Sequence, residues 1–250
     1  MYQKGRLDDI VDLLKKYGYV TVKFLVSELH YSNATINRDL NLLEAQKVVR
    51  RTYGGVELVE KRPTVLPFRY SLMKAEKLKI CKQAAELIKD GDTVFIDAST
   101  TTEYIARHLT EKKDITVITN NIAIVTHLSA YDIKVICLGG QIVEQPCMLG
   151  GEQTVENAMK YRADKAFFAT GSFYKEGKIG SSRLYYLLQK VMVENSKESY
   201  YLADHEKLRT VANAQELIMM DFSGVSGVIS DYEFDRQTQA KFPNTKFYKV

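Results

Sequence analysis

Apolar residues in the first 60 positions recur every three or four residues, which is the period of helices that bury one face. The first predicted helix covers residues 3–17, and Thr21 and Ser32 are positioned to cap two further helices. On the third helix the buried stripe consists of Ile36, Leu40 and Leu43. Arg38 falls almost opposite this stripe, so the exposed face of the third helix is predicted to be polar and basic.

Two helices joined by a tight turn, the second with such a face, are typical of a helix-turn-helix, whose second helix enters the DNA major groove. The runs 48–52 and 56–59 then predict a hairpin around Tyr53-Gly54-Gly55, which would form a wing against the DNA backbone. Exposed arginines on paired helices also occur in proteins that never bind DNA, but the basic hairpin directly after the third helix favours DNA binding. The residues expected to contact DNA are Ser32, Asn33, Thr35, Asn37, Arg38, Asn41, Arg50, Arg51 and Tyr53.

The chain divides at a segment that contains two of its four prolines, Pro63 and Pro67. We therefore expect a winged helix-turn-helix domain at residues 1–60, a linker at 61–72 and a larger domain at 73–250. In the larger part, β-branched and aromatic runs alternate with helical patterns. Strands are predicted at 93–97, 115–119, 133–138, 165–169, 199–203, 225–230 and 245–248. This alternation predicts an α/β fold, with a mostly parallel, Rossmann-like sheet covered by helices on both faces.

Three consecutive predicted strands end in polar or glycine-rich loops, at residues 97–102, 119–121 and 139–140. Ligands of parallel sheets bind outside the carboxyl ends of the strands. The first loop has four adjacent hydroxyls before a predicted helix, which is the chemistry of a phosphate site. Simple capping of that helix by Ser99 or Thr100 is the alternative for this loop alone, and the common edge of all three loops favours a ligand crevice.

The N-terminal segment resembles the winged helix-turn-helix of the DeoR family of bacterial transcription regulators. The family stretch Ser-x-x-Thr-Ile-Arg-Arg-Asp-Leu-x-x-Leu-Glu matches at Ser32, Thr35, Ile36, Arg38, Asp39, Leu40, Leu43 and Glu44. Asn37 stands where the family usually has its first arginine, and Tyr53 stands where a histidine is usual. The resemblance extends along the whole chain and implies a C-terminal domain that is similar in fold to ribose-5-phosphate isomerase and senses phosphorylated sugars.

The family's Asp-x-Gly-Thr-Thr loop corresponds to residues 97–101, with Ser99 in place of the glycine. The family's Asp-Ser-Ser-Lys stretch matches at Asp204 and Lys207, with His205 and Glu206 between them. The residues expected to bind the effector are Asp97, Ser99, Thr100, Thr101, Thr102, Asn120, Asn121, Gly139, Gly140 and Lys207.

Charge and composition agree with these expectations. Residues 1–62 hold 11 Lys and Arg against 8 Asp and Glu, and the remainder holds 24 against 23, so most of the net charge of +4 lies in the first quarter. No apolar run has the length of a membrane span, and the acid-containing N-terminus is unlike a signal peptide. The three cysteines have no CxxC spacing and no histidine near them in sequence, so we expect reduced thiols, a cytoplasmic location and neither metal nor cofactor.

The leading hypothesis is a transcription regulator with no catalytic residue, more specifically a homo-oligomeric repressor of carbohydrate genes. It would bind a double-stranded DNA operator and respond to a phosphorylated sugar. The rival is an isomerase-like enzyme for sugar phosphates with an accessory N-terminal domain, in which Asp97, Asp204 and Lys207 serve as acid, base or electrostatic stabiliser. A third hypothesis is a regulator whose sensor has lost its ligand and acts through a protein partner.

Overall fold

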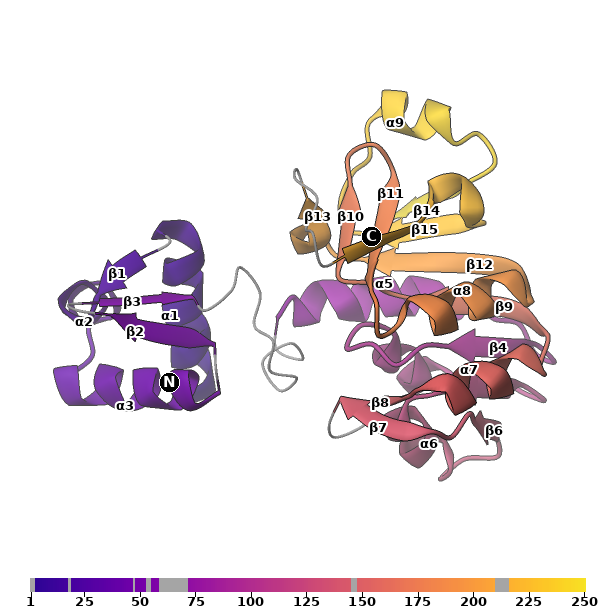
Figure 1. Ribbon diagram of the computed structural model, residues 1–250, viewed down its shortest axis with the longest axis horizontal. Helices are drawn as coiled ribbons and strands as arrows, with labels where there is room; N and C mark the ends of the chain where they lie inside the picture. The colour runs from indigo at the N-terminus through magenta and orange to yellow at the C-terminus, as the bar shows by residue number, and fades with distance from the viewer. Residues whose placement is uncertain are drawn as a thin grey trace. The chain divides into compact units, whose positions relative to one another are not determined.

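The computed structural model describes residues 3–17, 19–46, 48–52, 55–58, 72–144, 148–209 and 216–250. The chain forms two compact units, Met1–Leu72 and Met73–Val250 (Figure 1). Tyr53 and Gly54 of the predicted wing turn, Cys147 and residues 61–71 of the predicted linker lie outside the described residues.

The first unit is a winged helix-turn-helix, as the sequence predicts. Its elements are α1 (Gln3–Tyr17), β1 (Tyr19–Thr21), α2 (Val22–Leu29), α3 (Asn33–Ala45), β2 (Val49–Thr52) and β3 (Gly55–Leu58). The two predicted caps are confirmed: Thr21 Oγ1 accepts the Phe24 N–H at 3.1 Å, and Ser32 Oγ accepts the Thr35 N–H at 3.1 Å. Strand β1 was not predicted, because three residues are too short to show an alternating pattern. It pairs antiparallel with β3, which also pairs with β2.

The core of the first unit contains a charged group. Ile36, Leu40 and Leu43 of α3 are fully buried, as predicted, but so is Asp39 on the same helix. Its carboxylate accepts two hydrogen bonds from the Arg6 guanidinium of α1, one of them from Nη2 to Oδ1 at 3.0 Å. The same guanidinium lies 5.0 Å from the centre of the Tyr31 ring. This ion pair therefore joins the first helix to the third across the core.

The second unit contains a seven-stranded parallel sheet in the order β16-β15-β12-β9-β4-β5-β6. A smaller sheet in the order β13-β10-β11-β14 and a hairpin, β7-β8, complete it. The elements are α5 (Lys74–Glu86), β4 (Thr93–Ile96), η1 (Thr102–His108), β5 (Thr116–Thr119), α6 (Ile122–Leu128), β6 (Lys134–Cys137), β7 (Gln141–Glu144), β8 (Met148–Gly150), α7 (Glu152–Met159), β9 (Ala163–Phe168), β10 (Ser172–Tyr174), β11 (Lys178–Ser182), α8 (Tyr186–Glu194), β12 (Ser196–Ala203), η2 (His205–Lys207), β13 (Leu208–Arg209), β14 (Glu216–Asp221), η3 (Phe222–Gly224), β15 (Gly227–Ser230), α9 (Arg236–Lys241) and β16 (Lys246–Lys249).

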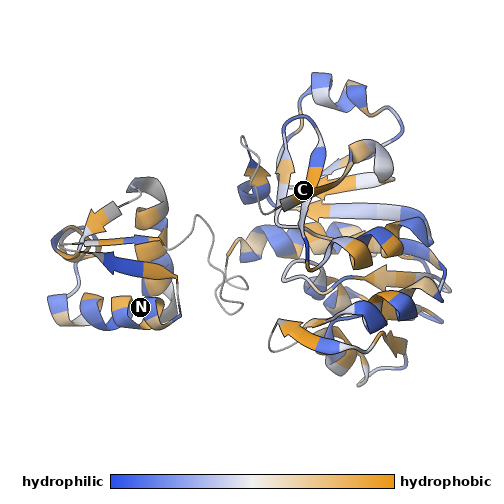
Figure 2. Ribbon diagram, viewed as in Figure 1, coloured by the Kyte–Doolittle hydropathy of each residue, from blue (hydrophilic) through white to orange (hydrophobic). Residues whose placement is uncertain are grey.

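Helices cover both faces of the large sheet, which confirms the predicted α/β architecture. Alternate residues of β4 point to opposite sides: Val94 and Ile96 join the cluster that contains α5 and α6, whereas Phe95 joins the cluster that contains α8. The helices carry hydrophobic and hydrophilic residues in alternation along their length (Figure 2), as expected for helices that bury one side. The predicted helix after residue 101 is a 3-10 helix, η1.

We predict that Asp39→Asn destabilises the first unit by roughly 3 kcal/mol, because it leaves the Arg6 guanidinium facing an amide in a largely dry site. Hydrogen exchange of the α3 amides in the full chain measures this loss. Glu57→Gln is the matched control, since it breaks the exposed Arg50–Glu57 pair and should cost less than about 1 kcal/mol. Equal exchange in the two variants would refute a structural role for the buried pair.

Candidate functional site

The strand order of the large sheet reverses between β4 and β9. From β4 the chain builds β5 and β6 on one side, and it then returns to add β9, β12, β15 and β16 on the other. A crevice at the carboxyl ends of the strands next to such a reversal is where open α/β sheets bind ligands. Here the residues that follow β4, β9 and β12 are Asp97, Ala169 and Asp204.

Asp97 is buried at this reversal point and binds three neighbouring elements. Its Oδ1 accepts from Thr102 Oγ1 at 2.7 Å. Its Oδ2 accepts from the Ala169 N–H at 3.2 Å and from Gln189 Nε2 of α8 at 2.8 Å. Burial raises the pKa of this carboxyl from 3.8 to about 6, although the hydrogen bonds from Gln189, Thr102 and Ala169 and the charge of Lys207 act in the opposite direction. The carboxylate thus fastens the loop after β4 to the other half of the sheet.

In the hydroxyl loop that follows Asp97, residues 99–102, some of the hydroxyl groups form hydrogen bonds with the backbone of the loop itself. Ser99 Oγ accepts from the N–H groups of Thr101 and Thr102 at 3.3 and 3.0 Å, so Ser99 caps the start of η1. Thr102 Oγ1, whose single hydrogen is directed to the Asp97 residue, also lies 2.8 Å from the Asp97 carbonyl oxygen. Ser99, one of the two residues in the capping alternative, therefore binds the backbone of its own loop, and Thr100 does not cap the helix. The side chains of Thr100 and Thr101 point to different partners.

Two lysines approach the hydroxyls of Thr100 and Thr101. Lys207 Nζ, after β12, donates to Thr101 Oγ1 at 3.0 Å and lies 3.7 Å from Asp204 Oδ2. Lys77 Nζ, on α5, donates to Thr100 Oγ1 at 3.3 Å, and this residue is only 3% exposed. The geometry thus brings Lys207 together with the predicted loop. Lys77 was not predicted, although its spacing of three and four residues from Ile80 and Cys81 places it on the buried stripe of α5.

Asn120 and Asn121 lie at the same strand edge, with their amides bonded to the protein. Asn120 Oδ1 accepts from the Ala98 N–H at 2.9 Å, and its Nδ2 donates to the Leu149 carbonyl at 2.7 Å. Asn121 caps α6 and donates to Glu103 Oε2 at 3.2 Å. Both are at most 2% exposed, so in this structure they hold the loops beside the site.

Gly139 and Gly140 form the third predicted loop. Both have positive φ angles, of 68° and 111°. A Cβ at residue 140 would collide with Thr154 Oγ1, which itself donates to the Gly139 carbonyl at 2.7 Å. The glycines therefore permit α7 to approach this loop closely.

In the first unit, the outer face of α3 carries the predicted DNA-contacting residues. Ser32, Asn33, Arg38 and Asn41 are exposed, and Thr35 and Asn37 are half-buried. Arg51 of β2 reaches back to this face: its Nη1 donates to Asn41 Oδ1 at 2.7 Å, and its Nη2 donates to Asn37 Oδ1. Arg50 instead pairs with Glu57 on the neighbouring strand at 2.6 Å. The two wing arginines thus have different surroundings, and only Arg51 joins the face of α3.

Family models match both units of the chain. Residues 6–62 match the DeoR-like helix-turn-helix domain, and residues 73–232 match the DeoR C terminal sensor domain. The chain belongs to the DeoR family. It is thus a DNA-binding transcription regulator by family, which confirms that part of the leading hypothesis.

Several DeoR-family relatives span most of this chain. The HTH-type transcriptional repressor GlcR of Bacillus subtilis (strain 168) is 35% identical over 83% of this chain and 81% of its own length. The lactose phosphotransferase system repressor of Lactococcus lactis subsp. lactis is 34% identical, over 83% and 84%. The glycerol-3-phosphate regulon repressor of Escherichia coli (strain K12) is 29% identical, over 88% and 90%. A solved ribose 5-phosphate isomerase from Methanocaldococcus jannaschii aligns with 55% of each chain at a TM-score of 0.41 and 19% identity.

Two departures from the DeoR-family pattern, His205 and Glu206, lie beside Lys207. His205 Nδ1 pairs with Asp231, and its backbone N–H donates to Asp231 Oδ1 at 2.7 Å. The Glu206 side chain is half exposed. Glu206 thus faces solvent to a large extent.

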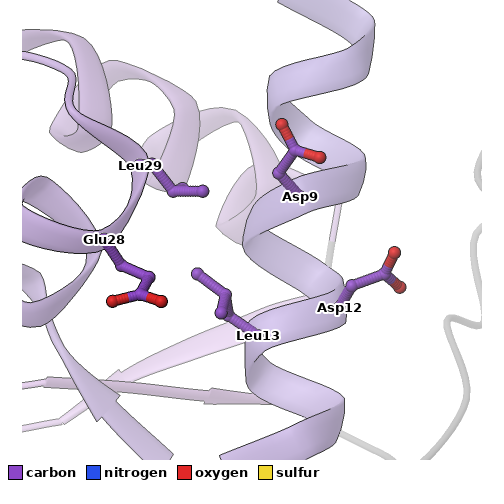
Figure 3. Close-up of a pocket in the computed structure, with 5 residues that line it drawn as sticks. All are labelled: Asp9, Asp12, Leu13, Glu28 and Leu29. Carbon is purple, nitrogen blue, oxygen red and sulfur yellow. The ribbon is translucent and has the colours of Figure 1, made fainter.

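A separate surface pocket lies between α1 and α2 of the DeoR-like helix-turn-helix unit (Figure 3). Its lining consists of Asp9, Asp12, Leu13, Glu28 and Leu29. Three carboxylates without a basic residue repel phosphate, so this pocket suits neither DNA nor an anionic effector. Among the described residues, no group of three or more His, Cys, Asp or Glu side chains is placed to hold a metal ion. No helix in the described ranges is long and apolar enough to cross a membrane.

We predict that Asp97 makes the stability of the sensor unit depend on pH. Because its pKa is higher in the folded chain than the ordinary 3.8, the folded state binds this proton more tightly. Its contribution to folding is greatest below about pH 4 and is lost as the pH rises through 6, a change of roughly 2–3 kcal/mol. Urea unfolding at pH 4.5 and 7.5 measures this dependence, and Asp97→Asn should remove that part of it. Parallel pH profiles for the two proteins would disprove the assignment.

Proposed function

We propose that this DeoR-family chain is a repressor of carbohydrate genes whose hold on its operator is controlled by a phosphorylated sugar. The supporting observation is the contact between Lys207, after β12, and Thr101, after β4. It places a cation and hydroxyls at the strand ends beside the reversal point, where the fold favours ligand binding. A phosphate oxygen is a stronger partner for an ammonium group than a neutral hydroxyl is. The effector's phosphate would therefore bind between Lys207 and residues 99–102.

The names of two relatives support a phosphorylated metabolite as the effector. One is the repressor of a lactose phosphotransferase system, and another is the repressor of a glycerol-3-phosphate regulon. For this chain, we propose that the amides of Asn120 and Asn121 and the backbone of Gly139 and Gly140 bind the sugar hydroxyls. Sugar hydroxyls would reach them only by exchange with the present protein partners.

The DNA side of the proposal rests on α3 and the wing. Ser32, Asn33 and Thr35 begin α3, and Arg38 and Asn41 are exposed further along it. The Arg51 guanidinium binds the side chain of Asn37, the position at which the family usually has an arginine. Arg51 thus supplies a positive charge there. We propose that Arg50 and Tyr53 of the wing contact the phosphates of the DNA backbone. Since one winged unit covers few base pairs, we propose that two or more chains read repeated half-sites, with contacts between their sensor units.

Control by the effector follows from a shift between two arrangements of such an oligomer. If the effector binds one arrangement more tightly, it raises the population of that arrangement. By linkage, an effector that weakens operator binding is itself bound less tightly when operator is present. The isomerase-like alternative is disfavoured because the Asp97 carboxylate is engaged by Thr102, Ala169 and Gln189 rather than presented to a substrate.

For the DNA contact we predict that Arg38→Ala weakens operator binding by roughly 1–3 kcal/mol, which is the value of one base contact made by an arginine. Binding to an operator selected from random duplexes, at fixed salt, measures the loss, and sedimentation of the same complex counts the chains on it. Arg236→Ala removes another exposed arginine, from α9, and should leave affinity unchanged. If both variants bind like the parent, Arg38 does not contact the operator. If a single chain occupies the operator, the proposed oligomer is wrong.

For the effector site we predict that Lys207→Met abolishes the response to a phosphorylated sugar and keeps operator binding near normal. The test is operator release by a panel of hexose and pentose phosphates. Lys197→Met, an exposed lysine on β12, is the control and should respond like the parent. A Lys207→Met protein that still releases operator at parental concentrations would place the effector elsewhere.

A further inference from the structure

The two neighbouring arginines of strand β2 extend in opposite directions, as successive residues of a strand do. Arg50 pairs with Glu57 of β3 at 2.6 Å and so stays on the wing. The Arg51 guanidinium instead donates to two side chains of α3. Arg51 therefore belongs to the surface of α3, although its backbone lies in the wing.

The Arg51 guanidinium spans one turn of α3. Its Nη1 donates to Asn41 Oδ1 at 2.7 Å and its Nη2 donates to Asn37 Oδ1, and residues four apart are neighbours on one helix face. The backbone N–H of Arg51 also donates to Glu44 Oε1 at 3.1 Å, so main chain and side chain are both fastened to the helix. A side chain that is already held in one orientation loses less conformational entropy when it binds a partner.

Asn37 uses both ends of its amide within the protein. Its Nδ2 donates to the Asn33 carbonyl at 2.9 Å, one turn earlier on α3, and its Oδ1 accepts from Arg51. An asparagine that reads adenine needs both ends of its amide for the base. Asn37 would therefore read a base only at the expense of these bonds, and its place in the structure suits a residue that orients Arg51. The two bonds from Arg51 to α3 use only two of the five N–H donors of a guanidinium.

We propose that Arg51 reads a guanine in the major groove and that Asn37 and Asn41 are the positioning residues that hold it there. This inference rests on the proposed entry of α3 into the major groove. The guanidinium donates to O6 and N7 of the base, the commonest specific contact of an arginine with DNA. Arg50, on the other side of the strand, contacts a phosphate. The operator preference of α3 thus depends on an arginine that the wing strand supplies.

The test compares Arg51→Ala with Arg50→Ala, which removes the same charge from the neighbouring residue. The probes are the operator selected from random duplexes, versions of it with each base pair of one half-site replaced in turn, and an unrelated duplex. Arg51→Ala should lose a preference for guanine of roughly five- to a hundredfold at one base pair of the half-site. Arg50→Ala should keep that preference, weaken binding to all duplexes by a similar factor, and lower the slope of log affinity against log salt by about one. Both variants should still bind the unrelated duplex, which shows that the first unit stays folded.

A double-variant cycle tests the positioning role of Asn37. Asn37→Ala should reduce the preference at the same base pair as Arg51→Ala does, and the double variant should lose no more of it than Arg51→Ala alone. A changed preference at a different base pair would show that Asn37 reads DNA itself and would overturn its positioning role.

The outcomes for Arg51 are separate from those for α3 as a whole. If Arg51→Ala weakens all duplexes alike, Arg51 contacts the DNA backbone and its reading of guanine is refuted, while a loss of affinity in Arg38→Ala still supports α3 as the helix in the groove. If neither Arg38→Ala nor Arg51→Ala changes operator binding, both proposals fail.

Discussion

The arrangement of the sensor unit depends on one buried carboxylate. Asp97 sits where the strand order reverses, and it accepts hydrogen bonds from the hydroxyl loop, from the end of β9 and from α8. Burial makes its charge costly, and the hydrogen bonds from Gln189, Thr102 and Ala169 offset part of that cost. Gln189 extends the link, because its Oε1 accepts from Ser181 Oγ of β11 at 2.8 Å. The loop proposed to bind the effector is thus fixed to both halves of the large sheet and to the smaller sheet.

The DNA-binding unit also has a buried carboxylate that joins separate elements. Asp39 on the buried side of α3 holds the Arg6 guanidinium of α1, while Arg38 and Asn41 on the other side remain exposed. Adjacent residues of one helix therefore serve different purposes, with Asp39 fixing the helix and Arg38 proposed to contact DNA. The surroundings of Arg51 show that the wing and α3 form one polar surface rather than two independent ones.

Sequence patterns predicted those parts of the fold that depend on local spacing. The helices of the first unit, their caps and the strands of the large sheet follow from apolar period and turn residues. The sequence did not reveal what depends on distant partners. Asp39 resembles any other polar residue in the sequence until Arg6 is placed beside it, and no local pattern connects Lys77 with its partner Thr100. Apart from the β10–β11 hairpin, the strands of the smaller sheet pair with partners far away in the sequence, as Phe173 does with Leu208 and Lys178 with Asp221.

The same limit applies to the candidate site. The position of the hydroxyl loop follows from the rule that strand ends bind ligands, and the contact with Lys207 agrees with the family pattern. Asn120 and Asn121 form hydrogen bonds with Leu149 and Glu103, and Gly140 packs against Thr154. No sequence motif connects these partners. Polar residues at a strand edge therefore predict where a site lies better than they predict which side chains remain available to a ligand.

We propose that an anion at the strand ends of the sensor unit controls DNA binding by the other unit. The most direct measurement is operator affinity of the full chain at fixed salt, titrated with each phosphorylated sugar and with the same sugar lacking phosphate. We expect at least one phosphorylated sugar to change the operator Kd severalfold and its unphosphorylated counterpart to have no effect. Equal effects of the two forms, or no effect of any phosphorylated sugar, would contradict it.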